Sequence, residues 1–301
     1  VYLPVIVYSE GELYTFSSRH FHHEHQYITK DKNGDEVIFE IPSEGKYEGK
    51  VVRVMADGTQ VRPFDISITK TVCGLLISCT LLVIIFLLVA KGYRIRGEKA
   101  PKGIQALIEP LVIYVRDDIA KPNIGKDYEK YLPYLLTVFF FIFFNNLLGL
   151  IPFFPFGANI TGNIAVTAVL ALFTFFITNL TGKKHYYEDI FNTPGVPWWL
   201  KFPLPLMPII EVVGCFIKPI VLAIRLFANI TAGHIVLLGF ITMIFIVGEM
   251  NVWAGAGMSV LSLILSIFAD CLEVLVAYVQ AYVFTMLSSI YFGMAAKEAH
   301  H

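Results

Sequence analysis

Charged residues are scarce in this chain of 301 residues: Asp, Glu, Lys and Arg make up only 16% of it, whereas 56% of it is hydrophobic. A water-soluble domain needs far more polar side chains to cover its surface. The composition therefore excludes an ordinary soluble protein and indicates a chain whose solvent is a lipid bilayer. The net charge of −1 includes no basic excess, so no nucleic-acid partner is expected.

Sequence motifs for enzyme chemistry are also absent. The chain has no Walker loop, no dinucleotide-binding glycine pattern, no serine elbow and no metalloprotease helix. Its cysteines lie in apolar runs without the paired spacing of a zinc site or a disulfide framework: Cys73, Cys79, Cys215 and Cys271. We expect small apolar fillers at these positions, and we expect the chain alone to have no catalytic activity, no cofactor and no metal.

The first 66 residues differ from the rest, because they carry many charges and short β-like runs at Val37–Ile41 and Lys50–Met55. The segments Lys32–Asp35 and Ala56–Thr59 contain Asn-Gly and Asp-Gly pairs, which accept the positive φ of a hairpin turn. We interpret residues 1–66 as a small, polar, β-rich segment that precedes the first membrane span.

Four histidines of this segment, His20, His22, His23 and His25, lie close together in sequence. Such a cluster can bind a metal ion, but solvated side chains are the commoner outcome in a polar segment. We favour the solvated interpretation.

Long runs without charge follow in residues 67–301, which we interpret as a membrane domain. Val72–Ala90 has about the 20 residues that a helix needs to cross the bilayer. Tyr131–Gly182 lacks Asp, Glu, Lys and Arg over a length that fits two spans, with a break where proline and glycine cluster at 152–162. Two more apolar segments follow, at Pro203–Val247 and Val252–Ala296.

Residues Ile104–Ile119 mix apolar and charged positions around Pro110, which is typical of a helix that lies on the membrane surface. The predicted fold is therefore an all-α integral membrane protein. It has five membrane-embedded helices, of which the last two are long, one amphipathic surface helix, and the small polar N-terminal segment.

The basic residues of the loops predict the orientation. The loops at 91–102 and 183–184 carry Lys and Arg, whereas those at 152–162 and 248–257 carry none. Cytoplasmic loops are the basic ones in membrane proteins. With five spans, the N-terminal segment is then expected to be extracytoplasmic and the C terminus cytoplasmic.

Arg225 lies well inside the apolar segment Ile220–Val247. An arginine at the centre of a membrane helix costs about 2.5–3.5 kcal/mol, and its guanidinium keeps its proton near neutral pH. An arginine that snorkels to the headgroups is the alternative, and Lys218 nearby supports it. We favour a functional residue, because the next Asp, Glu, Lys or Arg along the chain is Glu249.

Polar residues flank Arg225 along the same helix. Asn229 is one turn away on the same face. His234 is about 13 Å further along the axis, and Glu211 is about 21 Å away in the opposite direction. A permanent cation between titratable groups is what two separate proton half-paths need. For Glu211, a simple interfacial carboxylate is an equally good interpretation.

The last apolar segment carries Asp270, Glu273 and Gln280. Glu273 and Gln280 share a helix face, and Asp270 is close enough in sequence to share a proton with Glu273. A buried carboxylate together with His234 could pass protons. We favour such a relay over a static buried pair that only holds two helices together.

Three stretches resemble subunit a of rotary ATP synthases. Lys218–His234, with the sequence KPIVLAIRLFANITAGH, resembles the family's signature helix. Gln280–Leu287 is similar to its C-terminal helix, and Asn146–Pro152 is similar to its earlier membrane hairpin. The resemblance extends over residues 70–296, and the first 66 residues resemble nothing that we could identify.

The resemblance implies roles for individual residues. Arg225 matches the stator arginine that faces the carboxylate of a rotating c-ring. His234 and Glu273 match two inlet positions, between which some bacterial members exchange the acid and the histidine. Gly149 stands where the family often has aspartate, and Asp270 is an extra acid to which we assign no counterpart in the family. The other matches are Asn229 and Gln280 beside the arginine, Asn163 on the inlet side and Glu211 on the outlet side.

The function implied by the resemblance is a proton-translocating stator subunit with two offset half-channels, which Arg225 separates. The implied partners are the c-ring, subunit b of the peripheral stalk and the lipid bilayer. The implied location is the bacterial cytoplasmic membrane, in preference to the mitochondrial inner membrane. A self-contained secondary transporter and a structural membrane scaffold stay open as alternatives, although the sequence has no internal repeat of the kind that many transporters have.

Overall fold

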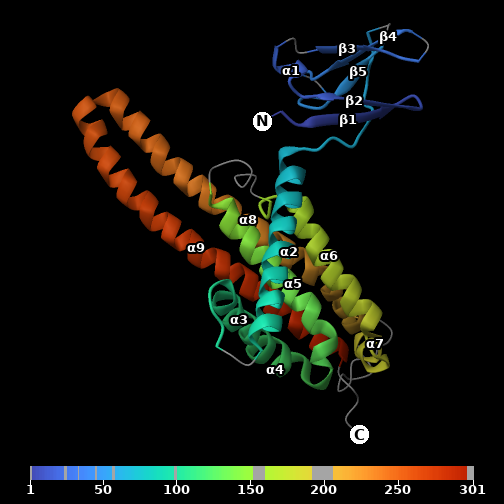
Figure 1. Cartoon of the computed structure of the whole chain (residues 1–301), viewed down its shortest axis with the longest axis vertical. Coiled ribbons are helices and arrows are strands. Elements are labelled where there is room, and N and C mark those ends of the chain that lie inside the picture. The colour runs from blue at the N-terminus through green and yellow to red at the C-terminus, as the bar shows by residue number, and fades with distance from the viewer. Residues whose placement is uncertain are drawn as a thin grey trace. The chain divides into compact units, whose positions relative to one another are not determined.

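The computed structural model describes most of the chain. The residues outside the description are 1, 24–25, 33, 45, 56–57, 98–99, 152–159, 192–205 and 297–301. The chain forms two compact units, Val1–Leu76 and Ile77–His301. Figure 1 shows strands in the first unit and helices in the second.

Two antiparallel sheets make up the N-terminal unit. One has the strand order β2-β1-β7 and the other has the order β3-β4-β5-β6. The strands are β1 Pro4–Ser9, β2 Glu12–Ser17, β3 Gln26–Lys30, β4 Glu36–Glu40, β5 Val52–Val54, β6 Gln60–Val61 and β7 Phe64–Asp65, and the short helix α1 is His20–His23. The prediction of a β-rich N-terminal segment is therefore confirmed.

Tight turns connect neighbouring strands of this unit. Both turns expected from sequence contain a glycine with positive φ, Gly34 at 88° and Gly58 at 79°. A further turn joins β1 to β2, where Glu10 and Gly11 both have positive φ. Positive φ at both central residues is the geometry whose twist matches a two-stranded hairpin.

Aromatic side chains fill the core of the N-terminal unit. Phe39 is fully buried, and its ring meets the edge of Tyr14 at a centroid distance of 5.2 Å. Phe16 stacks on Tyr27 at 4.1 Å. The nearly buried Arg53 pairs with Glu10 at 2.6 Å, so the charge of its guanidinium is balanced.

The membrane unit is helical. Its first helix, α2, begins in the N-terminal unit and continues into this one. The helical segments are α2 Lys70–Arg96, α3 Ile104–Tyr114, the π-helix Val115–Ala120, α4 Lys121–Ile124, the 3-10 turn Gly125–Asp127, α5 Tyr128–Gly149, α6 Ile164–Thr181, α7 Lys184–Phe191, α8 Leu206–Met250 and α9 Val252–Ala296.

Five helical stretches of the described chain are long and apolar enough to cross a membrane. They are Lys70–Ile95, Ile104–Gly149, Ile164–Thr181, Val212–Met250 and Trp253–Ala296. This confirms the predicted five spans. The second stretch is long because α3, the predicted surface helix, continues through short helical pieces into α5.

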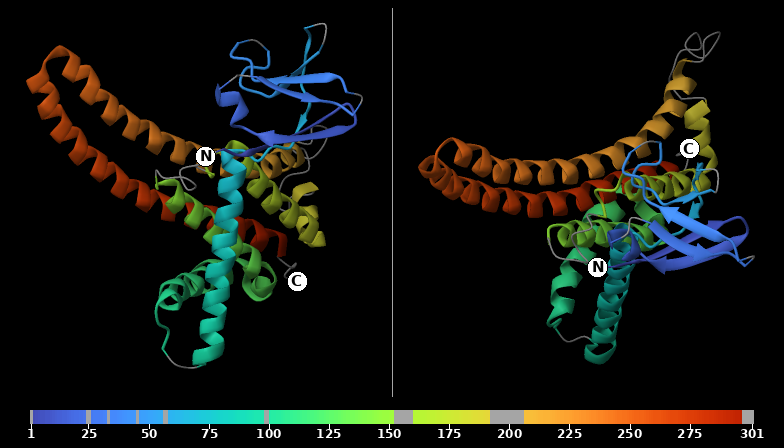
Figure 2. Two further views of the ribbon diagram at one scale, coloured as in Figure 1. Left: turned by 45° about the horizontal axis from the view of Figure 1, so that its top comes forward. Right: turned by 90° about the horizontal axis from the view of Figure 1, so that it is seen from above.

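Helices α8 and α9 form a long hairpin, and they lie side by side in both views of Figure 2. Asn251 joins them and accepts a hydrogen bond from the backbone of Trp253 at 2.9 Å. Each helix has 45 residues, a length of about 68 Å. That is more than twice the roughly 30 Å of a hydrocarbon core, so these helices stay in the bilayer only if they are strongly tilted.

The core of the membrane unit lies where α5 and α6 pack against α8 and α9. Phe139, Phe140 and Phe292 are fully buried there, together with Leu226 of α8. Polar side chains link helices as well: Ser78 of α2 donates to Asn145 at 2.6 Å. This bundle fixes the part of α8 and α9 that carries most of the predicted site residues.

Candidate functional site

A small polar cavity lies between α5, α8 and α9. Its lining includes Asn146 and Gly149 of α5, Asn229 and His234 of α8, and Glu273 of α9. It holds about 310 Å³ of empty space, its open mouth included. Only about 30 Å³ of this space is open to the centre of a water-sized sphere, which is room for about two waters. The cavity thus brings together three of the predicted site residues, Asn229, His234 and Glu273.

Glu273 is the most constrained of these residues. Both of its carboxylate oxygens are buried and accept no hydrogen bond from any described residue. The carboxylate packs against the backbone of Gly233 in α8. A Cβ atom at Gly233 would lie only 2.9 Å from Glu273 Cδ and 3.1 Å from Cγ, and closer still to Oε1. The absence of a side chain at Gly233 is therefore what lets Glu273 enter the cavity.

Asn146 contributes another unpaired acceptor to the same cavity. Its Nδ2 donates to the backbone oxygen of Ala277 at 3.3 Å, which ties α5 to α9. Its Oδ1 is buried and has no partner among the described residues. Buried polar atoms are costly unless something bonds to them. Three buried oxygens without a partner among the described residues therefore share this cavity with His234, and a water that enters it finds acceptors there.

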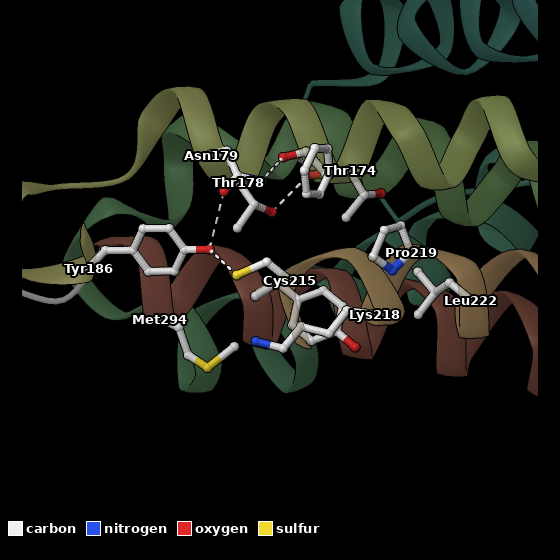
Figure 3. A pocket seen from close by; sticks show the side chains of 11 residues that line it. Thr174, Thr178, Asn179, Tyr186, Cys215, Lys218, Pro219, Leu222 and Met294 are labelled. Carbon is white, nitrogen blue, oxygen red and sulfur yellow. Dashed lines mark hydrogen bonds between the residues drawn. The ribbon is translucent and has the colours of Figure 1, made fainter. Parts of the chain in front are cut away.

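A second cavity lies further along the same helices, between α6, α7, α8 and α9 (Figure 3). Tyr186 of α7 projects into it and lies 3.5 Å from Asn179 Oδ1 and 3.8 Å from Cys215 Sγ. Lys218 of α8 also lines it, with its ammonium 5.3 Å from the ring centre of Tyr291. This cavity carries hydroxyl and amide groups together with a cation.

Arg225 lies between the two cavities and lines neither of them. Lys218 of one cavity and His234 of the other are about 24 Å apart along the α8 axis at 1.5 Å per residue. Arg225 is exposed on this stretch of α8, and so is Asn229 one turn later. The permanent charge thus lies between the two cavities along α8, and it is exposed on the surface of the chain.

The remaining predicted residues have different surroundings. Gln280 is buried on α9 in the interval between the two cavities. Asp270 is exposed and does not line the first cavity, although it is three residues from Glu273. Asn163 caps α6, where its side-chain oxygen accepts from the amide of Ala165 at 2.9 Å. The side chain of Glu211 lies outside the described part of the structure.

Of the histidine cluster, only His20 has a side chain that the structure describes. No group of three or more His, Cys, Asp or Glu side chains in the described part of the chain could hold a metal ion. The side chains of His22 and His23, and the whole of His25, fall outside the description.

Several lining residues could not be found by sequence reasoning about one helix at a time. Gly233 gains its importance only from Glu273, forty residues later in the chain. The polar face of α6 did carry a signal, because Thr174 and Thr178 are one helical turn apart in a mostly apolar helix. Tyr186 carried none, because its partners come from other helices.

Most of the chain matches a known protein family. A family model described as ATP synthase A chain matches residues 74–293. A second model, described as a domain of unknown function (DUF8433), matches residues 1–67.

Curated relatives match over most of their own length. An "ATP synthase subunit a 2" of Prosthecochloris aestuarii is 46% identical over 244 residues, which are 79% of this chain and 71% of the relative. An "ATP synthase subunit a" of Chlorobium phaeobacteroides is 40% identical over 284 residues, covering 90% of this chain and 78% of the relative. One of Myxococcus xanthus is 44% identical over 245 residues, covering 79% and 75%.

Proposed function

The chain belongs to the ATP synthase A chain family, and from that membership we propose that it is the stator subunit that carries protons past a rotating c-ring. It is a multi-pass membrane component of the complex and works in proton translocation, as the family does. The finer proposal is that it forms two offset half-channels separated by Arg225. The observation that carries this proposal is the pair of polar cavities on either side of Arg225.

The cavity with Glu273 and His234 is the proposed inlet. A carboxylate and an imidazole that line one small cavity can exchange a proton through one or two waters. Asn229 and Gln280 are the proposed polar neighbours near the c-ring. Asn163 is proposed to contribute to the inlet from the start of α6.

Asp270 is proposed to feed this inlet from outside the cavity. It is exposed, whereas the carboxylate oxygens of Glu273 are buried one turn later on the same helix. A proton captured at the exposed acid would therefore have a short way to travel. This role does not require a direct hydrogen bond between the two carboxyl groups.

A proton that leaves the inlet neutralises a carboxylate on the c-ring. The neutral site can then rotate through lipid, which a bare carboxylate could not do without a large cost in free energy. The driving force is about 2.3 kcal/mol per charge for each 100 mV of membrane potential.

The cavity with Lys218 and Tyr186 is the proposed start of the outlet, and Glu211 is proposed to lie further along it. A cation in this space lowers the tendency of the ring carboxylate to keep its proton as it arrives. Arg225 attracts the deprotonated carboxylate. Because guanidinium does not give up a proton, Arg225 also prevents protons from passing directly between the cavities.

The topology proposal follows from the basic loops. We propose that residues 1–66 form an extracytoplasmic segment, that residues 67–301 form the membrane domain, and that the C terminus is cytoplasmic. The membrane would be the bacterial cytoplasmic membrane. Subunit b of the peripheral stalk is a proposed further partner.

The test of this function is the substitution Arg225→Ala. We expect the complex to assemble, but neither to make ATP from a proton gradient nor to acidify vesicles during ATP hydrolysis. Arg225→Lys should not restore full activity, because an ammonium is a compact charge that can lose its proton when it is desolvated. Subunit content should be measured on the same vesicles.

Thr242→Ala is the matched control, because Thr242 is another exposed polar residue of α8. Its hydroxyl bonds only to its own helix, at 2.8 Å from the backbone oxygen of Leu238. This variant should pump normally. Near-normal pumping by Arg225→Ala would contradict the proposal and favour a scaffold, in which buried charges only hold helices together.

A further inference from the structure

The outer face of the sheet β2-β1-β7 in the N-terminal unit is apolar. Leu13 lies opposite Tyr8, and Tyr8 lies opposite Phe64, so the three side chains form a row across the strands. They are 61%, 47% and 70% exposed. A second row runs beside it and contains Thr15, Ile6 and Ile66, because Ile6 lies opposite Thr15 and Ile66 donates its amide to the Ile6 carbonyl at 2.9 Å.

The other sheet provides a contrast within the same unit. Ile28 of β3 is 57% exposed, so it is as open as the residues of the apolar rows. Ile38 of β4 lies opposite Ile28, and Val54 of β5 lies opposite Ile38. The residues that border this row on β3 and β4 are charged or polar: Gln26, Lys30, Glu36 and Glu40. No charged side chain lies in the two rows of the first sheet. Charged side chains therefore border the apolar row of the other sheet, whereas they are absent from the two rows of the first sheet.

The chain connects the apolar face directly to the first membrane span. Pairing with β1 continues past β7, since the amide of Ile68 donates to the Pro4 carbonyl at 3.3 Å. Helix α2 begins two residues later at Lys70, and Thr69 Oγ1 accepts from the amide of Val72 at 3.3 Å. Two extended residues cover at most about 7 Å. The sheet is thus tethered at the surface of the bilayer that α2 enters.

We propose that this face, defined by Leu13, Tyr8, Phe64, Ile6 and Ile66, docks on the bilayer at the boundary between headgroups and acyl chains. Tyrosine and phenylalanine beside aliphatic residues suit that boundary, where an apolar surface can leave water without losing polar contacts. The short tether keeps the face at a high effective concentration relative to lipid at all times. Lipid is therefore the occupant that the connectivity favours over a separate protein.

The experiment uses a photo-reactive residue in the assembled complex. Phe64→p-benzoylphenylalanine and Leu13→p-benzoylphenylalanine place the probe on the apolar face, and the same change at Ile28 places it on the other sheet. Leu76, which is 56% exposed in α2, gives a positive reference inside the span. The complex is reconstituted into vesicles of phosphatidylethanolamine and phosphatidylglycerol with radiolabelled acyl chains, and it is then irradiated.

We expect radiolabelled lipid on this subunit from Phe64 and Leu13 at a level several-fold above that from Ile28 and close to that from Leu76. Equal labelling from Phe64, Leu13 and Ile28 would overturn the proposal. Cross-links from Phe64 and Leu13 to another subunit in place of lipid would also overturn it. So would lipid labelling of Phe64 and Leu13 at background level in a sample in which Leu76 is labelled. Loss of pumping in an Arg225 variant leaves this result unchanged, so the two proposals are tested separately.

Discussion

Gly233→Ala is a small change that tests whether the position of Glu273 matters for proton transfer. The new Cβ atom would lie 2.9 Å from Glu273 Cδ, whereas ordinary contact begins at 3.4 Å. The carboxyl carbon must therefore retreat by about 0.5 Å, and the nearer oxygen must retreat further. Since the atoms in conflict are the end of a flexible side chain, the helices themselves need not separate.

We expect this substitution to slow proton transport and to leave the stability of the fold nearly unchanged. Alanine is better than glycine in a helix interior by about 1 kcal/mol, which offsets the roughly 0.5–1.5 kcal/mol of a displaced rotamer. Proton transfer is more sensitive, because a misplacement of about 1 Å can slow a reaction about 100-fold. We expect Gly233→Ala to reduce the rate of ATP-driven acidification by about 10- to 100-fold.

The measurement is the initial rate of acidification in vesicles with equal amounts of assembled complex. Gly239→Ala is the matched control, because Gly239 is on the same helix and an added Cβ there meets no atom within 4 Å. This variant should pump at the normal rate. A second change tests the cause: Glu273→Asp shortens the acid by one methylene, so it should partly restore pumping in the Gly233→Ala background.

Two results would refute this reasoning. One is a normal rate in Gly233→Ala, which would mean that Glu273 moves without consequence. The other is an equal loss in Gly239→Ala, which would mean that α8 tolerates no alanine at its glycines. Reduced assembly of Gly233→Ala would show that the side chain of Glu273 is held too firmly to move.

The double exchange of Glu273→His with His234→Glu should keep more pumping than either single change, because both side chains line one cavity. A double variant that pumps no better than the worse single variant would exclude a shared relay. Cysteines introduced at Lys30 and Lys184, both exposed, should react with an impermeant thiol reagent from opposite sides of the membrane. Reaction of both cysteines from the same side would reject the proposed topology. Phe39→Ala should destabilise the N-terminal unit by about 3–5 kcal/mol, seen as faster amide hydrogen exchange in β4, whereas unchanged exchange would contradict its place in the core.

The sequence was most informative where one helix carries the whole signal. The predicted bounds of the last apolar segment, Val252–Ala296, agree with α9, because apolar character ends at both limits of that segment. The lengths of the segments without charged residues likewise predict an all-α membrane fold. The turn between β1 and β2 is harder to predict, because Glu10 and Gly11 lack the Asn-Gly or Asp-Gly pair that marks the other two turns.

Contacts between helices explain what could not be predicted. Asp270 and Glu273 looked like partners because they are one turn apart, but three residues advance a helix by about 300°, which leaves the side chains about 60° apart. Glu273 faces Gly233 of α8, while Asp270 is exposed. The bond from Asn146 to the Ala277 carbonyl joins segments far apart in sequence, so no local pattern could indicate it.

The surroundings of Arg225 give a last reason to expect a partner that carries an acid. The outer parts of α8 and α9 expose large apolar side chains, among them Leu238, Phe245 and Phe268, so these helices are surrounded by lipid or by other helices. Arg225 is exposed on α8, and none of the ion pairs formed among the described residues includes it. A guanidinium in hydrocarbon without a counter-charge costs several kcal/mol, about 2.5–3.5 on the lowest scale. Because Glu273 faces a cavity that Arg225 does not line, we infer that the counter-charge comes from another subunit, as a carboxylate on a c-ring would supply.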